Sequence, residues 1–192
     1  MNSMNSMNSK NYLYTSFLLI ALVLTASAVS AQSKGPKTVR DYFMLLPGQY
    51  FSLDCCGGKS TKEGKEKYLK EYLAVEDTAN GYMKGYGDGA QDAFEMALFK
   101  KPDGSYVIGF YNIGEGDLED VPNTVFLQYR AGRWTDVSKT VVPSYAPKKN
   151  IYQLPRNGTT VEVFQKDEAA SDFNKGKKLY DLSWAKGKFK KV

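Results

Sequence analysis

Two adjacent cysteines are the first residues in this chain whose type and spacing could support chemistry. Cys55 and Cys56 are the only cysteines in the sequence. Consecutive Cα atoms lie about 3.8 Å apart, below the usual disulfide range of about 4.4–6.8 Å, so a bond between the two would be strained. The pair is consistent with a redox-sensitive loop, with a disulfide-linked dimer, or with two thiols that have no function, and the last interpretation is favoured.

Two groups of acidic residues could hold calcium or act on a sugar. Calcium requires about six to eight oxygen ligands, and neither group has the spacing of an EF-hand loop. A pair of carboxylates could also hydrolyse a glycosidic bond, if their separation suited that reaction. We interpret both groups as solvated loops and predict no metal and no other cofactor. The first group is Asp88, Asp92 and Glu95, and the second is Glu115, Asp117, Glu119 and Asp120.

The absence of histidine narrows the remaining chemistry. None of the 192 residues is histidine, which excludes Ser-His-Asp and Cys-His catalysis as well as imidazole-ligated metals. Carboxylate chemistry, oxygen-ligated calcium, thiol chemistry at one site and the absence of any chemistry remain, and we predict no catalytic residue.

Aromatic and basic side chains indicate surfaces that could bind a partner. Trp134, between Arg133 and Thr135 and close to Asp136, is the aromatic residue that we expect to be exposed. Lysines that could attract an anionic polymer or a membrane surface gather near the end of the sequence. Because Lys188 and Lys190 alternate with Phe189, the simpler interpretation is that they solvate the outside of an edge strand. These lysines are Lys175, Lys177, Lys178, Lys186, Lys188, Lys190 and Lys191.

The N-terminal segment has the pattern of a secretory signal peptide. Lys10 precedes an apolar run over 17–24, and small residues follow up to Ala31. This order is typical of a segment that signal peptidase removes, so we expect residues 1–31 to be cleaved between Ala31 and Gln32. We therefore predict a protein that is exported to the periplasm or the cell exterior and has no stable membrane span after cleavage.

The rest of the chain predicts one domain that is mainly β. Residues 32–37 form a polar leader, and 38–192 form a single globular domain. Helical spacing from Val39 to Leu46 predicts an amphipathic helix, and a second helix is expected over 66–73. From Val75 onward, short apolar runs alternate with turn residues, which predicts eight or nine antiparallel strands. One of them is expected to carry Phe94, Met96 and Leu98 on one face and to meet the strand over 106–113 through a turn over 102–104.

These strands are expected to form one large, curled sheet. A meander of this size tends to curl, either open or closed into a barrel, with the N-terminal helix packed on it. The strand over 106–113 has apolar residues in alternate and adjacent positions, so we expect both of its faces to be covered.

Taken together, the residues favour a binding protein over an enzyme. We predict an exported, non-catalytic binding or interaction domain whose ligand is a small molecule, a glycan or a protein, with no nucleic-acid partner. The alternative is a carboxylate-dependent hydrolase that acts outside the cytoplasm on a substrate such as a glycan. The hydrolase requires two acidic residues that converge in one cleft, whereas the binding domain requires an exposed or apolar surface.

Overall fold

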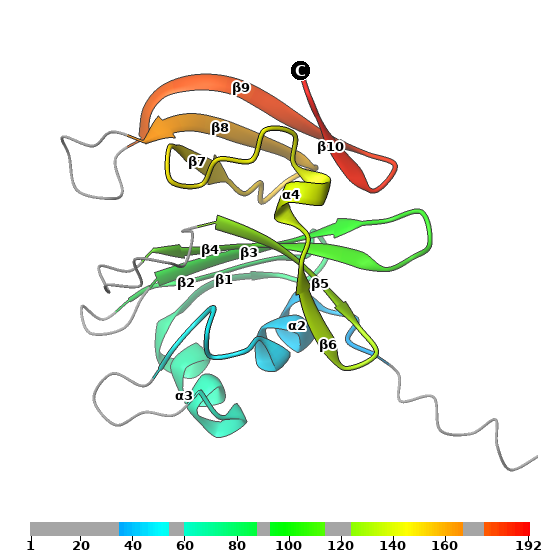
Figure 1. The fold of residues 1–192 in the computed structure, drawn as a ribbon. Helices are drawn as coiled ribbons and strands as arrows, with labels where there is room; N and C mark the ends of the chain where they lie inside the picture. Colours follow the sequence, from blue (N-terminus) through cyan, green and yellow to red (C-terminus); the bar gives the residue numbers. More distant parts are fainter. Residues whose placement is uncertain (1–34, 54–59, 88–92, 114–123, 167–174) are drawn as a thin grey trace, which may run out of the picture. The chain divides into compact units, whose positions relative to one another are not determined.

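The computed structural model describes residues 35–53, 60–87, 93–113, 124–166 and 175–192. The chain divides into two units, Met1–Pro36 and Lys37–Val192, and all the described helices and strands lie in the second unit. The described part is mainly β, as predicted, with two antiparallel sheets (Figure 1).

The first sheet is a six-stranded meander in which each strand pairs with the next along the chain. Two helices precede it, α2 (Val39–Leu45) and α3 (Lys62–Tyr72). The strands of the first sheet are β1 (Leu73–Asp77), β2 (Tyr82–Gly85), β3 (Ala93–Lys100), β4 (Tyr106–Ile113), β5 (Thr124–Arg130) and β6 (Arg133–Asp136).

The second sheet has four strands in the order β10-β9-β8-β7. The short helix α4 (Ser138–Val141) lies between the two sheets in the sequence. The strands of the second sheet are β7 (Asn150–Gln153), β8 (Thr160–Lys166), β9 (Lys175–Ala185) and β10 (Lys188–Lys191).

The expectation of one large, curled sheet is therefore corrected to two sheets. The backbone hydrogen bonds of the first sheet end just after β6, where Val137 N donates to Phe126 O at 2.8 Å. Ser138 Oγ then accepts from Phe126 N at 2.8 Å, so a side chain satisfies a backbone group that a continuing ladder would use. The chain turns into α4 at this point, and β7 begins a new ladder.

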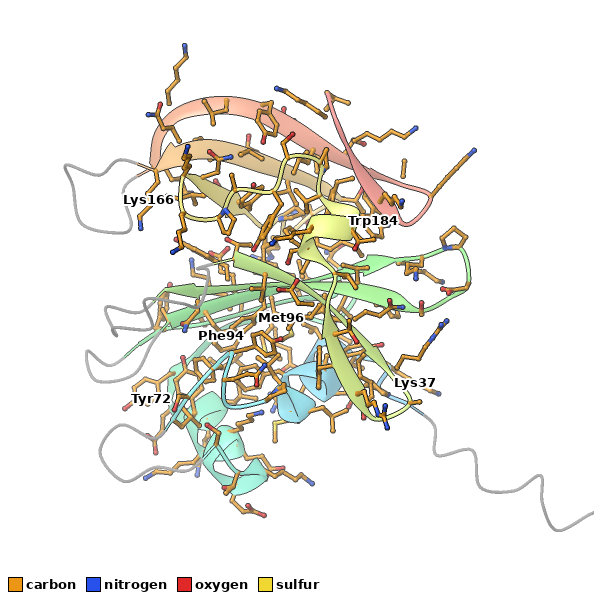
Figure 2. The ribbon with its side chains drawn as sticks, in the orientation of Figure 1. Lys37, Tyr72, Phe94, Met96, Lys166 and Trp184 are labelled. Atoms are coloured by element: carbon orange, nitrogen blue, oxygen red, sulfur yellow. The ribbon has the colours of Figure 1, made fainter. Side chains whose placement is uncertain are left out.

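The central strands of the first sheet are buried on both faces, because residues of β3, β4 and β5 alternate between two apolar clusters. On one face, Phe94 and Met96 belong to a cluster that includes Phe43 of α2 and Tyr68 of α3. Figure 2 shows Phe94 and Met96 between the strands and these helices. The rings of Phe43 and Phe94 stack with their centroids 4.5 Å apart.

The other face of the first sheet packs against the second sheet. Phe99 and Phe126 share a cluster with Tyr152, Leu182 and Phe189 of the second sheet. The ring centroids of Phe99 and Phe189 lie 4.9 Å apart, and those of Phe126 and Phe189 lie 5.1 Å apart. β4 contributes Ile108 to one cluster and Val107 to the other, so the expectation that both of its faces are covered is confirmed.

The two sheets approach closely at Gly109 of β4. A Cβ atom at this position would lie 2.7 Å from Leu154 Cδ2 and 3.1 Å from Phe99 Cε2. Glycine is therefore required here by space, because real Cβ atoms do not approach other side chains this closely.

Candidate binding surface

Most of the predicted site residues lie outside the residues that the structure describes. This part of the chain includes 1–34, 54–59, 88–92 and 114–123. The residues concerned are Ala31, Gln32, Cys55, Cys56, Asp88, Asp92, Glu115 and Asp117.

Glu95, the described member of the first acidic group, is held by two neighbours on β2. Lys84 lies opposite Glu95 in the β2–β3 register, and its Nζ donates to Glu95 Oε1 at 2.9 Å. The Tyr82 hydroxyl also hydrogen-bonds Glu95, and burial, with the Glu95 charge second, raises the pKa of Tyr82. The Glu95 carboxylate is thus paired with a lysine and a tyrosine of the neighbouring strand.

Trp134, expected to be exposed, is half-buried at the edge of the first sheet. Its Nε1 donates to Leu45 O at 2.9 Å, close to the C-terminal end of α2. Its ring lies 5.1 Å from the ring of Tyr129 and 6.3 Å from that of Tyr42, measured between centroids. Trp134 therefore covers the apolar cluster beneath α2. Its indole is occupied by these contacts and is not the freely exposed aromatic group that the sequence predicted.

Lys65 is a buried charge that sequence analysis did not identify. Its Nζ donates to the carbonyl oxygens of Phe43 (3.1 Å), Met44 (3.3 Å) and Leu46. These carbonyls are at the C-terminal end of α2, where a helix leaves acceptors without partners and where a positive charge is favourable. Burial lowers the pKa of Lys65 to about 8, which leaves the amine protonated at neutral pH. These hydrogen bonds explain why Lys65 is buried, and they give it a structural role at the end of α2.

Within the described residues, no three His, Cys, Asp or Glu side chains are grouped so that they could hold a metal ion. No helix of the described ranges combines the length and the apolar character that crossing a membrane requires.

The solvent-facing side of the second sheet is its strongly charged face. Lys188 and Lys190 are exposed on β10, which is an edge strand, while Phe189 between them is buried. This confirms the predicted alternation. The same face carries Lys178, whose Nζ lies 2.7 Å from Glu162 Oε1 and 2.8 Å from Asp181 Oδ1.

Two further lysines extend this face toward the start of β9. Lys175 Nζ donates to Gln153 Oε1 at 2.7 Å and lies 5.4 Å from the ring centroid of Phe164. Lys166 lies opposite Lys175 in the β8–β9 register. We call these residues the lysine face: Lys166, Lys175, Lys178, Lys188 and Lys190.

Charge pairing on the lysine face is uneven. Lys178 contacts both acidic residues, Glu162 and Asp181, and these contacts raise its pKa, with Asp181 contributing most. Among the described residues, Lys188 and Lys190 have no ion-pair partner. These two lysines are therefore available to an anionic ligand without the loss of an existing pair.

Charged residues are also distributed unevenly along the chain. Residues 37–137, which form the helices α2 and α3 and the first sheet, contain twelve Lys and Arg residues and sixteen Asp and Glu residues. Residues 138–192, which form α4 and the second sheet, contain twelve and five. The modest net charge of +5 thus combines a net negative segment over 37–137 with a net positive segment over 138–192. Such asymmetry between two halves is typical of proteins that bind anionic partners.

Comparison with known protein families, curated proteins and solved structures finds no match to this chain. An interpretation of function therefore depends on the geometry and charge of the chain itself.

Apolar side chains are exposed beside the lysine face. Leu179 is 43% exposed and has no partner in the β8–β9 register, because Val163 pairs with Tyr180 and the next residue, Phe164, pairs with Lys178. Such an extra residue forms a β-bulge, and it turns Leu179 out of the ladder. Val192 is 72% exposed, and its N–H donates to Asp181 O at 2.9 Å, two residues from Leu179.

The position of Lys188 and Lys190 on an edge strand was predictable from the sequence, but the full lysine face was not. Alternation around Phe189 gives the orientation of Lys188 and Lys190. That Lys166, Lys175 and Lys178 lie on the same face depends on two irregularities in the β8–β9 register, which alternation does not reveal. A count of charges on either side of residue 137 is the signal that would have indicated the surface.

Proposed function

We propose that this chain is an exported, non-catalytic binding domain that binds an anionic ligand on the lysine face. The observation that carries the proposal is the contrast in coverage. The central strands of the first sheet are buried on both faces, whereas the lysine face of the second sheet is rich in exposed charge.

A binding role also fits the way that acidic groups are used. Glu76 lies 2.6 Å from Arg40, Asp77 lies 3.2 Å from Arg156, and Glu95 is paired with Lys84. A carboxylate-dependent hydrolase needs two carboxylates that face each other across a cleft, one of them protonated. These three carboxylates instead each face a basic group, which supports the binding role.

Export and the position of α2 are parts of the same proposal. Lys10, the apolar run over 17–24 and the small residues up to Ala31 support cleavage before Gln32. After cleavage, α2 would be the N-terminal amphipathic helix that covers one face of the first sheet. Intact mass of the protein recovered outside the cytoplasm tests this, and we expect the mass of a chain that begins at Gln32.

Binding is tested with heparin as a soluble anionic probe, by titration at low and high salt. We expect heparin to bind the native chain and to be released by salt, since screening weakens interactions between exposed charges. A Lys188→Glu/Lys190→Glu variant is expected to bind at least about tenfold more weakly, because two attractive charges become repulsive.

The matched control is Lys67→Glu/Lys70→Glu, which makes the same charge change at exposed positions of α3. We expect it to bind heparin within about twofold of the native chain, because α3 packs on the opposite face of the first sheet. Equal losses in both variants would contradict a binding role for the lysine face. Hydrolysis of a glycan that is abolished by Glu95→Gln would support the hydrolase instead.

A further inference from the structure

The lysine face combines positive charge with exposed apolar side chains, and this combination narrows the ligand class. Four large apolar side chains of the described residues are exposed: Leu45, Tyr86, Leu179 and Val192. Two of these, Leu179 and Val192, lie in the second sheet next to its charged residues. Leu179 is the unpaired bulge residue next to Lys178. Val192 lies two residues after Lys190, which by alternation places it on the side of Lys190, and its N–H donates to Asp181 O of β9.

We infer that the lysine face docks on an anionic phospholipid surface, an inference that rests on the proposed binding function. A soluble polyanion would neutralise the lysines but leave Leu179 and Val192 in water. A membrane interface offers phosphate groups to the lysines and an apolar boundary to the two hydrophobic side chains. The lipid surface is therefore the partner that accounts for both observations.

The arrangement of the lysines suits a surface of many anionic groups. Lys188 and Lys190 are two residues apart on one strand, which places them about 7 Å apart on the same side of β10. Lys191 stands on the other side of β10, with its Nζ 4.1 Å from the ring centroid of Tyr180. The pair Lys188 and Lys190 thus approaches the lipid phosphates, while Lys191 covers an aromatic ring at the edge.

The described acidic residues do not cancel this attraction. Glu162 and Asp181 are the described acidic residues of the second sheet, and both contact Lys178. Lys188 and Lys190 form no ion pair with either of these carboxylates. Binding is expected to be weak and reversible, because each basic side chain near an anionic membrane adds only a modest attraction that salt screens.

The test is co-sedimentation of the chain with vesicles of phosphatidylcholine alone and with vesicles of equal parts phosphatidylcholine and phosphatidylglycerol. We expect binding to the mixed vesicles at least about tenfold stronger than to the neutral ones, and loss of this difference at about 0.5 M salt. The apolar run over 17–24, where it is retained, is the same in every variant, so differences among variants report on the second sheet.

Two variants separate the charged and apolar contributions. Lys188→Glu/Lys190→Glu is expected to remove the preference for mixed vesicles, whereas the control Lys67→Glu/Lys70→Glu keeps it within about twofold. Leu179→Ser/Val192→Ser is expected to weaken vesicle binding severalfold while leaving heparin binding unchanged, because heparin offers no apolar phase. Circular dichroism of each variant verifies that the β structure is retained.

The possible failures are distinguishable. Heparin binding through Lys188 and Lys190 without preference for mixed vesicles would overturn the lipid inference and leave the proposed binding function in place. Binding to neither probe through these lysines would overturn both. Equal vesicle binding by the Leu179→Ser/Val192→Ser variant and the native chain would also overturn the lipid inference, because charge alone would then account for the result.

Discussion

The two sheets of this protein use the same alternation of side chains for different purposes. In the first sheet, Phe94 and Phe99 are both buried although they belong to opposite faces of β3. In the second sheet, Phe189 is buried while its neighbours Lys188 and Lys190 are exposed. A sheet covered on both sides contributes mainly to stability, whereas a sheet with one free face can both stabilise the fold and meet a ligand. A ligand-binding surface is therefore expected on the uncovered face of the second sheet.

The largest expected effect comes from removing an aromatic side chain of the first sheet. Phe94 is fully buried, and its ring stacks on Phe43 and on Phe110. We expect Phe94→Ala to lower the free energy of unfolding by about 3–5 kcal/mol, the usual cost of such a cavity. Urea denaturation followed by circular dichroism gives the value.

Removing an aromatic side chain from the second sheet is expected to lower the free energy of unfolding much less. Phe164 is a partly buried residue on the side of the lysine face, with Lys175 above its ring. Phe164→Ala is expected to cost less than about 1.5 kcal/mol. Equal losses of unfolding free energy for Phe94→Ala and Phe164→Ala would contradict the distinction between strands covered on both faces and strands covered on one.

An effect smaller than that of Phe94→Ala, with a distinctive pH dependence, is expected at Lys65. Lys65→Met leaves three carbonyls at the end of α2 without their donor, which is expected to cost about 2 kcal/mol at pH 7. The cost should increase as the pH rises. The folded pKa of about 8 lies below the unfolded pKa, so above pH 8 the unfolded chain binds more protons, and native stability rises with pH up to about 10.5.

Urea denaturation of the native chain and of Lys65→Met from pH 7 to pH 10 tests this. The variant lacks the titrating group and should not share the rise, so the difference between the two proteins should widen. Parallel stability curves across this range would contradict the assigned role of burial at Lys65.

The smallest expected effect concerns the start of α2. Asp41 N donates to Thr38 Oγ1 at 3.1 Å, and Thr38 N donates to Asp41 Oδ2 at 2.9 Å, which together form a capping box. Thr38→Ala is expected to cost about 1 kcal/mol. The hydrogen bonds from the backbone of Lys37 and Thr38 hold the pKa of Asp41 below its usual range.

The capping contribution should therefore be lost as the pH falls. A lowered folded pKa stabilises the native state above the unfolded pKa of Asp41 and ceases to do so in more acidic solution. Thermal unfolding of the native chain and of Asp41→Asn at neutral and acidic pH measures this. A difference between the two proteins that does not decrease on acidification would contradict the capping role.

The sequence allowed the individual strands to be predicted better than their pairing. Alternation around Phe94, Met96 and Leu98 and the turn over 102–104 correctly predicted β3 and β4, because local pattern and turn chemistry agree there. The β7 strand was missed, since Ile151 and Tyr152 are both buried and show no alternation. The division into two sheets depends on where Ser138 ends the first ladder, and no periodicity reveals such a tertiary contact.

The site was less predictable than the fold. Lys65 lies three and four residues before Tyr68 and Leu69, so helical spacing places it on the buried face of α3. The expected helix began at residue 66, one position too late to include it. The lysine face required the β8–β9 register, whose irregularities bring lysines of three strands to one side.

Hydrogen exchange measured by mass spectrometry, with and without vesicles that contain phosphatidylglycerol, tests the central claim most directly. If the lysine face is the binding surface, the vesicles should slow amide exchange in β8, β9 and β10 and leave α3 and β1 unchanged, because bound lipid excludes water from the strands it covers. Slower exchange in α3 and β1, with no change in β8 to β10, would contradict the account.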